Sequence, residues 1–354
     1  VIRNHLEMSR YANKFDLDDP EVIDSFAQFI EGEQRLRFLY VHTFCDANAT
    51  APDLWNDHKE ELHTQLFINT LNVLEGKHAR KDPSSLKNAY SEIAVEGVPQ
   101  EELIDHLEQV PERYFSHAGK EEVALHVQMV NRFKNNLGDS SKPVLSWRND
   151  VRRSLTIVDI VTRDRPALFE KIAGGFSVAG LNILGARAVT RKDGIAIDVF
   201  YVEGEKGGIV KDSKIRELCE SSIHAFLENE TSPDKLISEK RKKTDSTRLF
   251  SNEDRLGERI PPSVDVYHDV SLSRIIVEVR AADQVGLLHL IAKTISRCGF
   301  SIQFARVATE QEIATDVFNI EMSDNNKSFS PSQFLKLREE LNESLNAGKY
   351  YLEV

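Results

Sequence analysis

The chain has 354 residues, with 45 Lys and Arg residues against 57 Asp and Glu residues, a formal net charge of −12, and 40% hydrophobic residues. At about 100 to 200 residues per domain, this length predicts two or three domains. No run approaches the roughly 18 apolar residues of a membrane helix, and the acidic balance disfavours nucleic acid, whose phosphates attract clustered Lys and Arg. We therefore predict a protein that neither spans a membrane nor binds nucleic acid.

Three cysteines, Cys45, Cys219 and Cys298, lie far apart and form no CxxC motif. Their odd number and wide spacing argue against a disulfide scaffold and against a structural zinc site, and we predict a cytoplasmic protein. The chain begins at Val1 without an initiator Met or the layout of a signal peptide. We therefore expect it to be a piece of a longer protein.

Helical periodicity dominates the first 150 residues. The residues Asp18-Asp19-Pro20 supply an acidic cap followed by a proline at the first helical position. The apolar residues that follow recur on one helical face: Val22, Ile23, Phe26, Ala27 and Ile30. The same period continues over residues 36–44 and 62–74. The polar segment Gly138–Pro143 is then typical of a spacer between domains.

Beyond Asn149 and Asp150 the pattern changes to strands alternating with helices, and the sequence repeats itself. The spacing between matching residues is 119, and a single-residue deletion near Gly194 shifts it to 118. Two alternating strands, Ser154–Val161 and Arg274–Ala281, open the copies. The identities that follow include Ile172 with Ile291, Gly180 with Gly299, Ala186 with Ala305, Arg187 with Arg306, and Asp198-Val199-Phe200 with Asp316-Val317-Phe318. So many identities in one register indicate two copies of one structural unit.

Each copy is predicted to run strand, helix, strand, strand, helix, strand, which is the α+β ferredoxin-like order βαββαβ. The predicted closing strands are Val264–Tyr267 in the first copy and Tyr350–Val354 in the second. A charged insertion from Thr231 to about Pro262 delays the first of them. Its basic cluster, Lys240 to Lys243, is interpreted as a solvated linker.

Between the first strand and first helix of each copy lies a short loop that is a candidate ligand site. These loops are Asp164-Arg165-Pro166-Ala167-Leu168 and Asp283-Gln284-Val285-Gly286-Leu287. A helix start exposes backbone N–H groups and the positive end of the helix dipole, which together suit a ligand carboxylate. The alternative is that Asp164 and Asp283 only cap their helices.

The loops DRPALF and DQVGLL, with the segments GLNILGARAVT and GFSIQFARVAT, resemble tandem ACT domains. The resemblance implies that the two units bind an amino acid at an interface between domains and associate through such interfaces. Two departures from the family pattern leave open which copy binds tightly. The second loop carries Gln284-Val285 in place of Arg-Pro, and the first carries Ala167 in place of Gly.

Three motifs in the helical part point to a larger family. They are Asn4–Ser9 with Asp16–Ile23; Leu36–Asp46 with Ala49-Thr50, Trp55 and Lys59; and Pro111–Phe115 with His126. Placed before two ACT-like units, they resemble the carboxy-terminal portion of the bifunctional PII uridylyltransferase and uridylyl-removing enzymes. The resemblance covers nearly the whole chain.

That resemblance implies a parent enzyme that uses UTP to attach UMP to the PII signal protein. An HD-type phosphohydrolase domain with a divalent Mg or Mn ion removes the UMP, and the ACT pair senses glutamine. By motif position, Asp46 matches a metal-ligand Asp of the HD domain, and His5 lies where some HD sites add a His. The alternative for Asp46 is a helix-surface or interhelix carboxylate hydrogen-bonded to Thr43 or Thr50, and His42 is interpreted as a chance neighbour.

No catalytic set is complete in this chain, because the Gly-Ser loop with paired aspartates of the transferase and the His-Asp doublet of the HD site are both missing. The doublet His268-Asp269 lies beside a predicted ACT strand and is interpreted as incidental. We therefore expect the chain alone to be inactive.

The predicted architecture is multidomain, with all-α segments followed by two α+β units. Residues 1–75 are predicted as the second half of an HD domain, 76–150 as a helical connector, 151–270 as the first ACT domain and 271–354 as the second. Two other functions remain open. One is a non-catalytic amino-acid-binding module, and the other is an ACT-regulated HD phosphohydrolase acting on another nucleotide.

Overall fold

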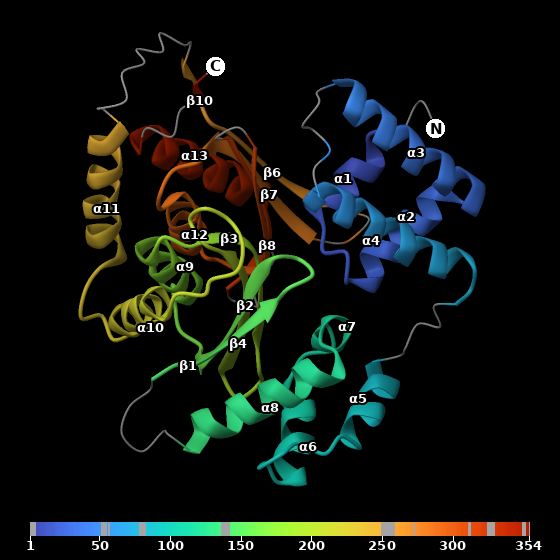
Figure 1. Ribbon diagram of the computed structural model, residues 1–354, viewed down its shortest axis with the longest axis horizontal. Helices are drawn as coiled ribbons and strands as arrows, with labels where there is room; N and C mark the ends of the chain where they lie inside the picture. The colour runs from blue at the N-terminus through green and yellow to red at the C-terminus, as the bar shows by residue number, and fades with distance from the viewer. Residues whose placement is uncertain are drawn as a thin grey trace. The chain divides into compact units, whose positions relative to one another are not determined.

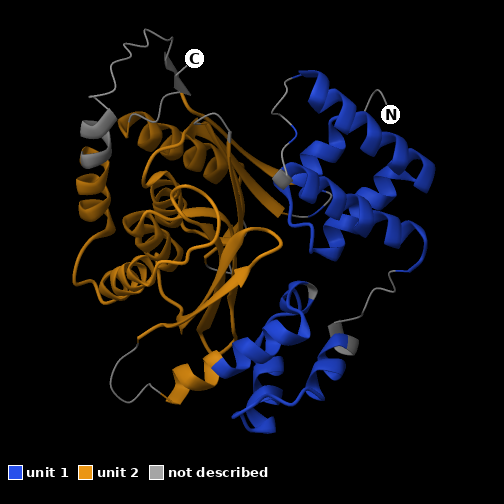
Figure 2. Ribbon diagram, viewed as in Figure 1, with its two compact units in different colours: residues 1–128, 270–273 blue, residues 129–269, 274–354 orange. Residues whose placement is uncertain are grey.

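The computed structural model describes residues 5–50, 55, 57–77, 83–135, 142–248, 259–270, 272, 274–310, 313–323, 330–348 and 352–353. Its contacts divide the chain into two compact units, residues 1–128 with 270–273 and residues 129–269 with 274–354 (Figure 2). Among the described residues, no helix is both long enough and apolar enough to cross a membrane.

The first unit is helical in its described residues. Its elements are α1 (Glu7–Lys14), α2 (Pro20–Ile30), α3 (Glu33–Thr50), α4 (Asp57–Leu74), α5 (Pro83–Ser91), α6 (Gln100–Gln109), α7 (Tyr114–His117) and the start of α8 (Lys120–Asn135). The predicted start of α2 is confirmed, because the Asp19 side chain accepts a hydrogen bond of 2.9 Å from the Glu21 amide, and Pro20 takes the first helical position. The predicted apolar face of α2 is buried.

The second unit is built on one eight-stranded antiparallel sheet (Figure 1). Its strands are β1 (Val144–Asp150), β2 (Leu155–Arg163), β3 (Asn182–Thr190), β4 (Ile195–Glu203), β6 (Ser263–Asp269), β7 (Arg274–Ala282), β8 (Phe300–Glu310) and β9 (Ile313–Met322). The strand order is β1-β2-β4-β3-β8-β9-β7-β6, which reads as one repeat followed by its mirror order. The two repeats meet at β3 and β8, where Ala186 pairs with Ala305.

Helices α9 (Leu168–Ala179), α10 (Ser213–Leu227), α12 (Leu287–Arg297) and α13 (Pro331–Ala347) pack on the sheet and share one hydrophobic core with it (Figure 1). In the first repeat, Phe200 of β4 contacts Phe176 of α9, with ring centroids 5.0 Å apart. Gly175 allows α10 to approach α9 closely, since a Cβ there would lie 2.3 Å from Cγ1 of Ile223. The predicted mixture of helices and antiparallel strands is thus confirmed.

The predicted closing strands are wrong in detail. Val264–Tyr267 falls in β6, which pairs with β7 and therefore opens the second repeat. Its counterpart β1 pairs with β2 in the first repeat, although residues 144–150 were predicted to end the connector. The physical reason is local: only four residues separate β6 from β7 along the chain, and short connections join antiparallel neighbours. Each repeat therefore runs ββαββα.

The segment Tyr350–Val354 does not close the main sheet either. Its residues 350, 351 and 354 lie outside the described residues, as do residues 138–141 of the predicted spacer. The remainder forms β10 (Leu352–Glu353), which pairs with β5 (Arg259–Ile260) in a separate two-stranded sheet.

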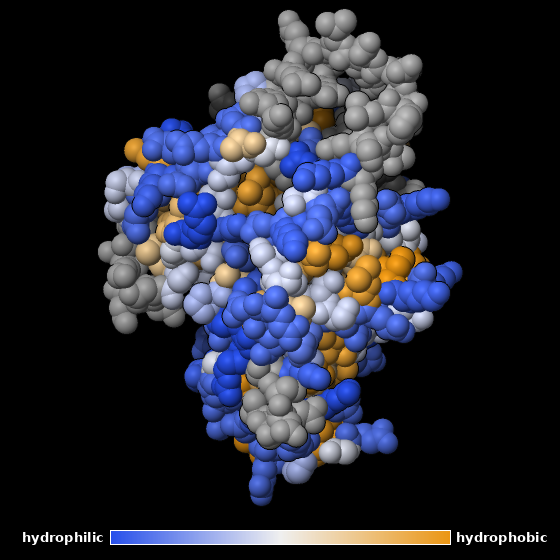
Figure 3. All heavy atoms as spheres, turned by 90° about the vertical axis from the view of Figure 1, so that its left-hand side faces the viewer, coloured by the Kyte–Doolittle hydropathy of each residue, from blue (hydrophilic) through white to orange (hydrophobic). Residues whose placement is uncertain are grey.

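The charged insertion contains a helix, α11 (Pro233–Arg248), and the solvated-linker interpretation of its basic cluster is wrong for Lys240. The half-buried Lys240 ammonium donates to the carbonyls of Ser177 (3.1 Å) and Val178 (3.2 Å) at the end of α9. A cation suits a helix C-terminus, where carbonyl groups lack partners. Burial nevertheless lowers the pKa of Lys240. The face seen from the side of α11 is mainly hydrophilic, with small apolar groups (Figure 3).

Asp234, near the start of α11, ties this helix to α12. Its carboxylate accepts hydrogen bonds from His289 (3.2 Å) and from Lys293 (2.6 Å). His289 also bonds through Nδ1 to the carbonyl of Glu170 in α9 (2.8 Å). The insertion is therefore part of the packed second unit, in contact with both repeats.

Candidate ligand-binding loops

The first candidate loop joins β2 to α9. The amide of Asp164 donates to the carbonyl of Gly194 (2.9 Å), and Oδ2 of Asp164 accepts from the Thr190 hydroxyl (3.2 Å). The residue before α9, Ala167, lies in the left-handed region at φ 65°, and no described side chain caps the first turn of the helix. The capping alternative for Asp164 is thus wrong. The amide of Leu168 donates to the carbonyl of Arg165 (3.2 Å), so a backbone carbonyl and not a side chain meets the first amide of the helix.

The other predicted residues of this loop have separate roles. The Arg165 guanidinium donates to the carbonyl of Leu227 at the end of α10 (2.9 Å), so it joins α9 and α10 rather than extending over the loop. Pro166 is exposed, while Leu168 is buried in the core. Within the described structure, Asp164, Pro166 and Ala167 are therefore the loop residues that remain beside the helix start.

The second loop has the same backbone form but is covered. Gly286 lies at φ 87°, and α12 also begins without a described side-chain cap, so Asp283 does not cap it. A Cβ at Gly286 would lie 2.4 Å from Cγ2 of Ile237 in α11. The Arg241 guanidinium, also from α11, contacts the side-chain oxygen of Gln284. The two loops therefore share a backbone conformation, and α11 covers the second loop.

Of the remaining residues of the second loop, one differs from its counterpart in burial and one does not. Val285 is half-buried where Pro166 is exposed, and Leu287 enters the core as Leu168 does. The Arg241 guanidinium also donates to the carbonyl of Gly348 (2.7 Å), which holds α11 against the end of α13.

Each repeat also carries a buried aspartate that the sequence interpretation used only as a repeat identity. Asp198 of β4 and Asp316 of β9 are 3% and 1% exposed. Burial, together with the charge of Asp164, raises the pKa of Asp198 to about 8. Burial and the charge of Asp283 raise the pKa of Asp316 well above its ordinary value. An acidic residue at the same position of two mainly apolar strands is the sequence signal for them.

The predicted metal ligands lie in the first unit. The imidazole rings of His5 and His42 have centroids 5.6 Å apart, and His42 precedes Asp46 by one turn of α3. Nδ1 of His42 is buried without a hydrogen-bond partner among the described residues. Two imidazoles and a carboxylate are donor types that divalent transition metals accept. Within the described residues, however, neither His5 nor Asp46 belongs to a cluster of three possible ligands.

The alternative for Asp46 is confirmed in its helix-surface position and wrong in its hydrogen bonds. Its carboxylate is on an exposed part of α3. The Thr43 hydroxyl donates to the carbonyl of Leu39, and the Thr50 hydroxyl donates to the backbone carbonyl of Asp46, each at 2.8 Å. Neither threonine therefore binds the Asp46 carboxylate.

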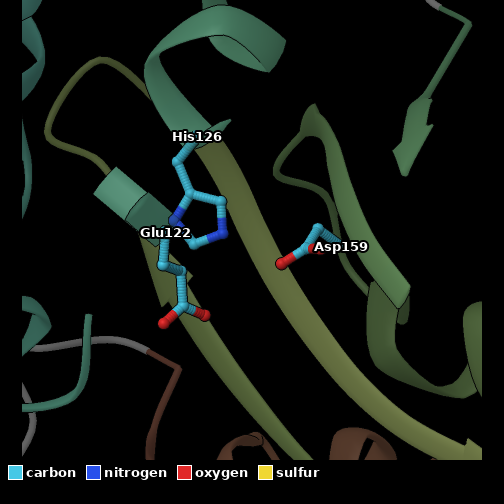
Figure 4. A group of neighbouring side chains, drawn as sticks. All are labelled: Glu122, His126 and Asp159. Carbon is cyan, nitrogen blue, oxygen red and sulfur yellow. The ribbon is translucent and has the colours of Figure 1, made fainter. Parts of the chain in front are cut away.

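The third motif of the helical part forms a buried hydrogen-bond chain. The Tyr114 hydroxyl lies 2.9 Å from Nδ1 of His126 and 3.3 Å from Nε2 of His106. His126 and Glu122 project from successive turns of α8 (Figure 4). The motif thus has a packing role that joins α6, α7 and α8.

Asp159, also drawn in Figure 4, belongs to the second unit. Its two carboxylate oxygens accept hydrogen bonds of 2.7 and 2.8 Å from the Arg148 guanidinium, so this fully buried charge is paired within that unit. The pair connects the edge strand β1 to β2. Separating the two side chains would leave an uncompensated buried charge. The pair therefore holds β1 on the sheet.

Comparison with known proteins places this arrangement in a family context. No family model matches the chain. A bifunctional uridylyltransferase/uridylyl-removing enzyme of Caulobacter vibrioides is 29% identical over 339 residues, covering 92% of this chain and 34% of the relative. Those of Gluconobacter oxydans and Pseudomonas putida are 28% identical over 360 residues, covering 98% and 99% of this chain.

The chain is homologous to these enzymes. The predicted resemblance is therefore confirmed along nearly the whole chain. The chain spans only 34% to 38% of the length of these three relatives, so the similarity concerns one part of them.

Proposed function

We propose that this chain is the carboxy-terminal, regulatory portion of a cytoplasmic enzyme that attaches UMP to the PII signal protein and removes it. In this proposal the two repeats are ACT domains that sense an amino acid, glutamine. The observation that carries the proposal is the paired loop geometry: in both repeats a residue in the left-handed region precedes a helix start without a described side-chain cap.

The loop geometry suits a free amino acid for a physical reason. A helix start presents several N–H groups and the positive end of the dipole to a carboxylate. In the first repeat, Asp164 of the loop accepts a hydrogen bond from Thr190 at the end of β3, and their acidic and hydroxyl groups suit a positively charged partner. A zwitterion offers both charges at once, whereas an inorganic anion offers one.

A sensor also needs a route from the ligand to the rest of the protein. Both loops lie at the ends of strands of the same sheet, and α11 contacts α9, α12 and the second loop. A ligand that favours one arrangement of these elements shifts the population of the whole unit toward it. In the parent enzyme this shift would move the balance between UMP attachment and UMP removal.

The catalytic parts of the proposal belong to the parent protein. A divalent Mg or Mn ion would activate water against the phosphodiester there, with UTP as the donor for attachment. His5 and Asp46 supply suitable donors, but the described residues of this chain do not complete a ligand set around them. We therefore derive no hydrolytic step for this chain and expect it alone to be inactive toward uridylylated PII.

Calorimetric titration of the whole chain with L-glutamine tests the sensing role. We expect saturable binding at millimolar or lower concentration, with weaker or absent binding of the other amino acids and of 2-oxoglutarate. Binding of another amino acid in preference to glutamine would support an amino-acid sensor of different specificity. No binding by any amino acid would contradict the sensing role itself.

A further inference from the structure

His289, in the first turn of α12, joins three neighbouring helices of the second unit (Figure 1). Its side chain is buried, and Nδ1 lies 2.8 Å from the backbone carbonyl of Glu170 in α9. Nε2 lies 3.2 Å from a carboxylate oxygen of Asp234 in α11. A Cβ at Gly174 of α9 would lie 2.8 Å from Cβ of Pro233 and 3.3 Å from Nδ1 of His289. The three helices are therefore packed closely around one imidazole ring.

The two partners of this ring decide how many protons it carries. A backbone carbonyl and a carboxylate only accept hydrogen bonds, whereas a neutral imidazole donates from one nitrogen and accepts at the other. Burial alone would raise the pKa of Asp234, but the hydrogen bonds from Lys293 (2.6 Å) and His289 lower it overall, so this carboxyl is ionised at neutral pH. Both nitrogens of His289 must then carry a hydrogen, which makes the ring an imidazolium.

The helices packed around the ring also carry other charged groups. They are Glu170 and Lys171 of α9, Asp234 of α11 and Lys293 of α12. Lys171 donates to Asn229 (2.7 Å), and Glu340 of α13 pairs with Arg297 at the opposite end of α12 (3.8 Å). Burial raises the pKa of Glu170, and the charge of His289 opposes that rise. Glu170 is therefore the second group near the ring whose titration an experiment must separate from that of His289.

Helix α11 extends from this ring to the second loop. Its first turn carries Asp234, and one turn later Ile237 fills the space over Gly286, where a Cβ would lie 2.4 Å from Cγ2 of Ile237. One further turn along, the Arg241 guanidinium contacts the side-chain oxygen of Gln284. The hydrogen bond between Asp234 and His289 therefore fixes the end of α11 that leads into this cover.

We propose that α11 is a proton-sensitive strap over the start of α12, held closed by the imidazolium form of His289. In the closed strap the ring donates one hydrogen bond to the Glu170 carbonyl and one to the Asp234 carboxylate. When the ring releases a proton to the solvent, it keeps only one donor and loses its positive charge, and the strap opens. This regulatory device does not depend on the proposed amino-acid sensing.

The direction of the pH dependence follows from the proton count. The closed strap holds one proton more than the open strap, in which His289 is exposed. An exposed imidazole loses its proton near pH 6.5, so closure should weaken as the pH rises above that value. The equilibrium constant for opening should increase by up to about tenfold per pH unit.

Amide hydrogen exchange of the whole chain at pH 6.5, 7.5 and 8.5, corrected for the intrinsic exchange rate at each pH, measures this opening. The informative peptides cover residues 233–242 of the strap and residues 284–290 beneath it. We expect exchange in both to rise together with pH. In parallel, nuclear magnetic resonance of the chain labelled with ¹⁵N-histidine should show hydrogen on both ring nitrogens of His289 at pH 7.

Four variants make the test specific. His289→Gln removes the charge and one donor, so opening at pH 6.5 should increase at least about tenfold and should no longer vary with pH. Glu170→Gln keeps the backbone carbonyl, and His268→Gln changes a histidine of β6, so both should preserve the pH profile of the parent. Gly174→Ala displaces Pro233 and should open the strap at every pH. Circular dichroism checks the fold of each variant.

Each contrary outcome has a defined meaning. A neutral His289 ring at pH 7, or equal pH profiles for the parent and His289→Gln, overturns the inference. A flat profile in Glu170→Gln assigns the pH dependence to Glu170 and overturns the role of His289. Faster exchange over residues 233–242 in Gly174→Ala with unchanged exchange over residues 284–290 shows that α11 is not a cover. These outcomes leave the proposed sensing role standing.

Discussion

Replacing Asp198 by Asn should stabilise the second unit increasingly as pH rises from 5 to 7. The folded chain raises the pKa of this carboxyl from 3.8 to about 8, because the group is buried beside Asp164. At pH values between 3.8 and about 8, the Asp198 carboxyl carries a proton in the folded state and has lost it in the unfolded state. The free energy of unfolding of the parent chain therefore falls as the pH rises. This fall ends near pH 8, where the folded state also loses the proton.

The expected size follows from the same linkage. For each pH unit in this window, the free energy of unfolding of the parent should fall by about 1.4 kcal/mol relative to that of the variant. The difference should reach about 2 to 3 kcal/mol between pH 5 and pH 7. Urea unfolding at pH 5, 6 and 7, followed by Trp147 fluorescence in a Trp55→Phe background, restricts the signal to the second unit. The exposed Asp265→Asn change is the control, and its difference from the parent should not vary with pH. Parallel pH profiles for parent and Asp198→Asn would contradict the burial argument.

The second large effect is expected from Gly286→Ala. An alanine there must adopt φ 87°, and its Cβ would lie 2.4 Å from Cγ2 of Ile237. Left-handed strain of about 1 kcal/mol and overpacking of about 1 to 3 kcal/mol should combine to a loss of about 2 to 4 kcal/mol. The measurement is again urea unfolding of the second unit.

Gly299→Ala is the matched control, since Gly299 lies at φ 84° with nothing within 4 Å of its added Cβ. It should lose only the strain of about 1 kcal/mol. Adding Ile237→Ala to Gly286→Ala should recover part of the larger loss, which a double-mutant cycle measures. Equal losses for the two glycine variants would show that α11 does not cover the second loop.

The repeat was the part of the fold most accessible to sequence reasoning. Identities such as Gly180 with Gly299 fix which segments are equivalent, and the alternation of β2 and β7 fixes their type. The position of β6 was not accessible in the same way, because alternation in Val264–Tyr267 shows a strand without showing which neighbour it pairs with. The pairing of β6 with β7, like that of β1 with β2 in the first repeat, is a property of the assembled sheet.

In the candidate site, too, local features could be predicted from the sequence and contacts between distant segments could not. The loop residues were predicted because a helix start after a strand has a local signature. Asp164 does not cap α9, and its carboxylate instead accepts from the Thr190 hydroxyl, which comes from another strand. The cover over Gly286 depends on Ile237, from an insertion whose composition suggested a linker. Asp198 was visible as a repeat identity, but its burial beside Asp164 required the sheet register.

The central claim is that an amino acid binds at the strand–helix loop of the first repeat. Amide hydrogen exchange of the whole chain, with and without L-glutamine, tests it at the level of peptides. The account predicts slower exchange in peptides that cover residues 164–172, and a smaller change over residues 283–291. Glutamine-dependent protection confined to other segments, or unchanged exchange over residues 164–172 at saturating ligand, would contradict it.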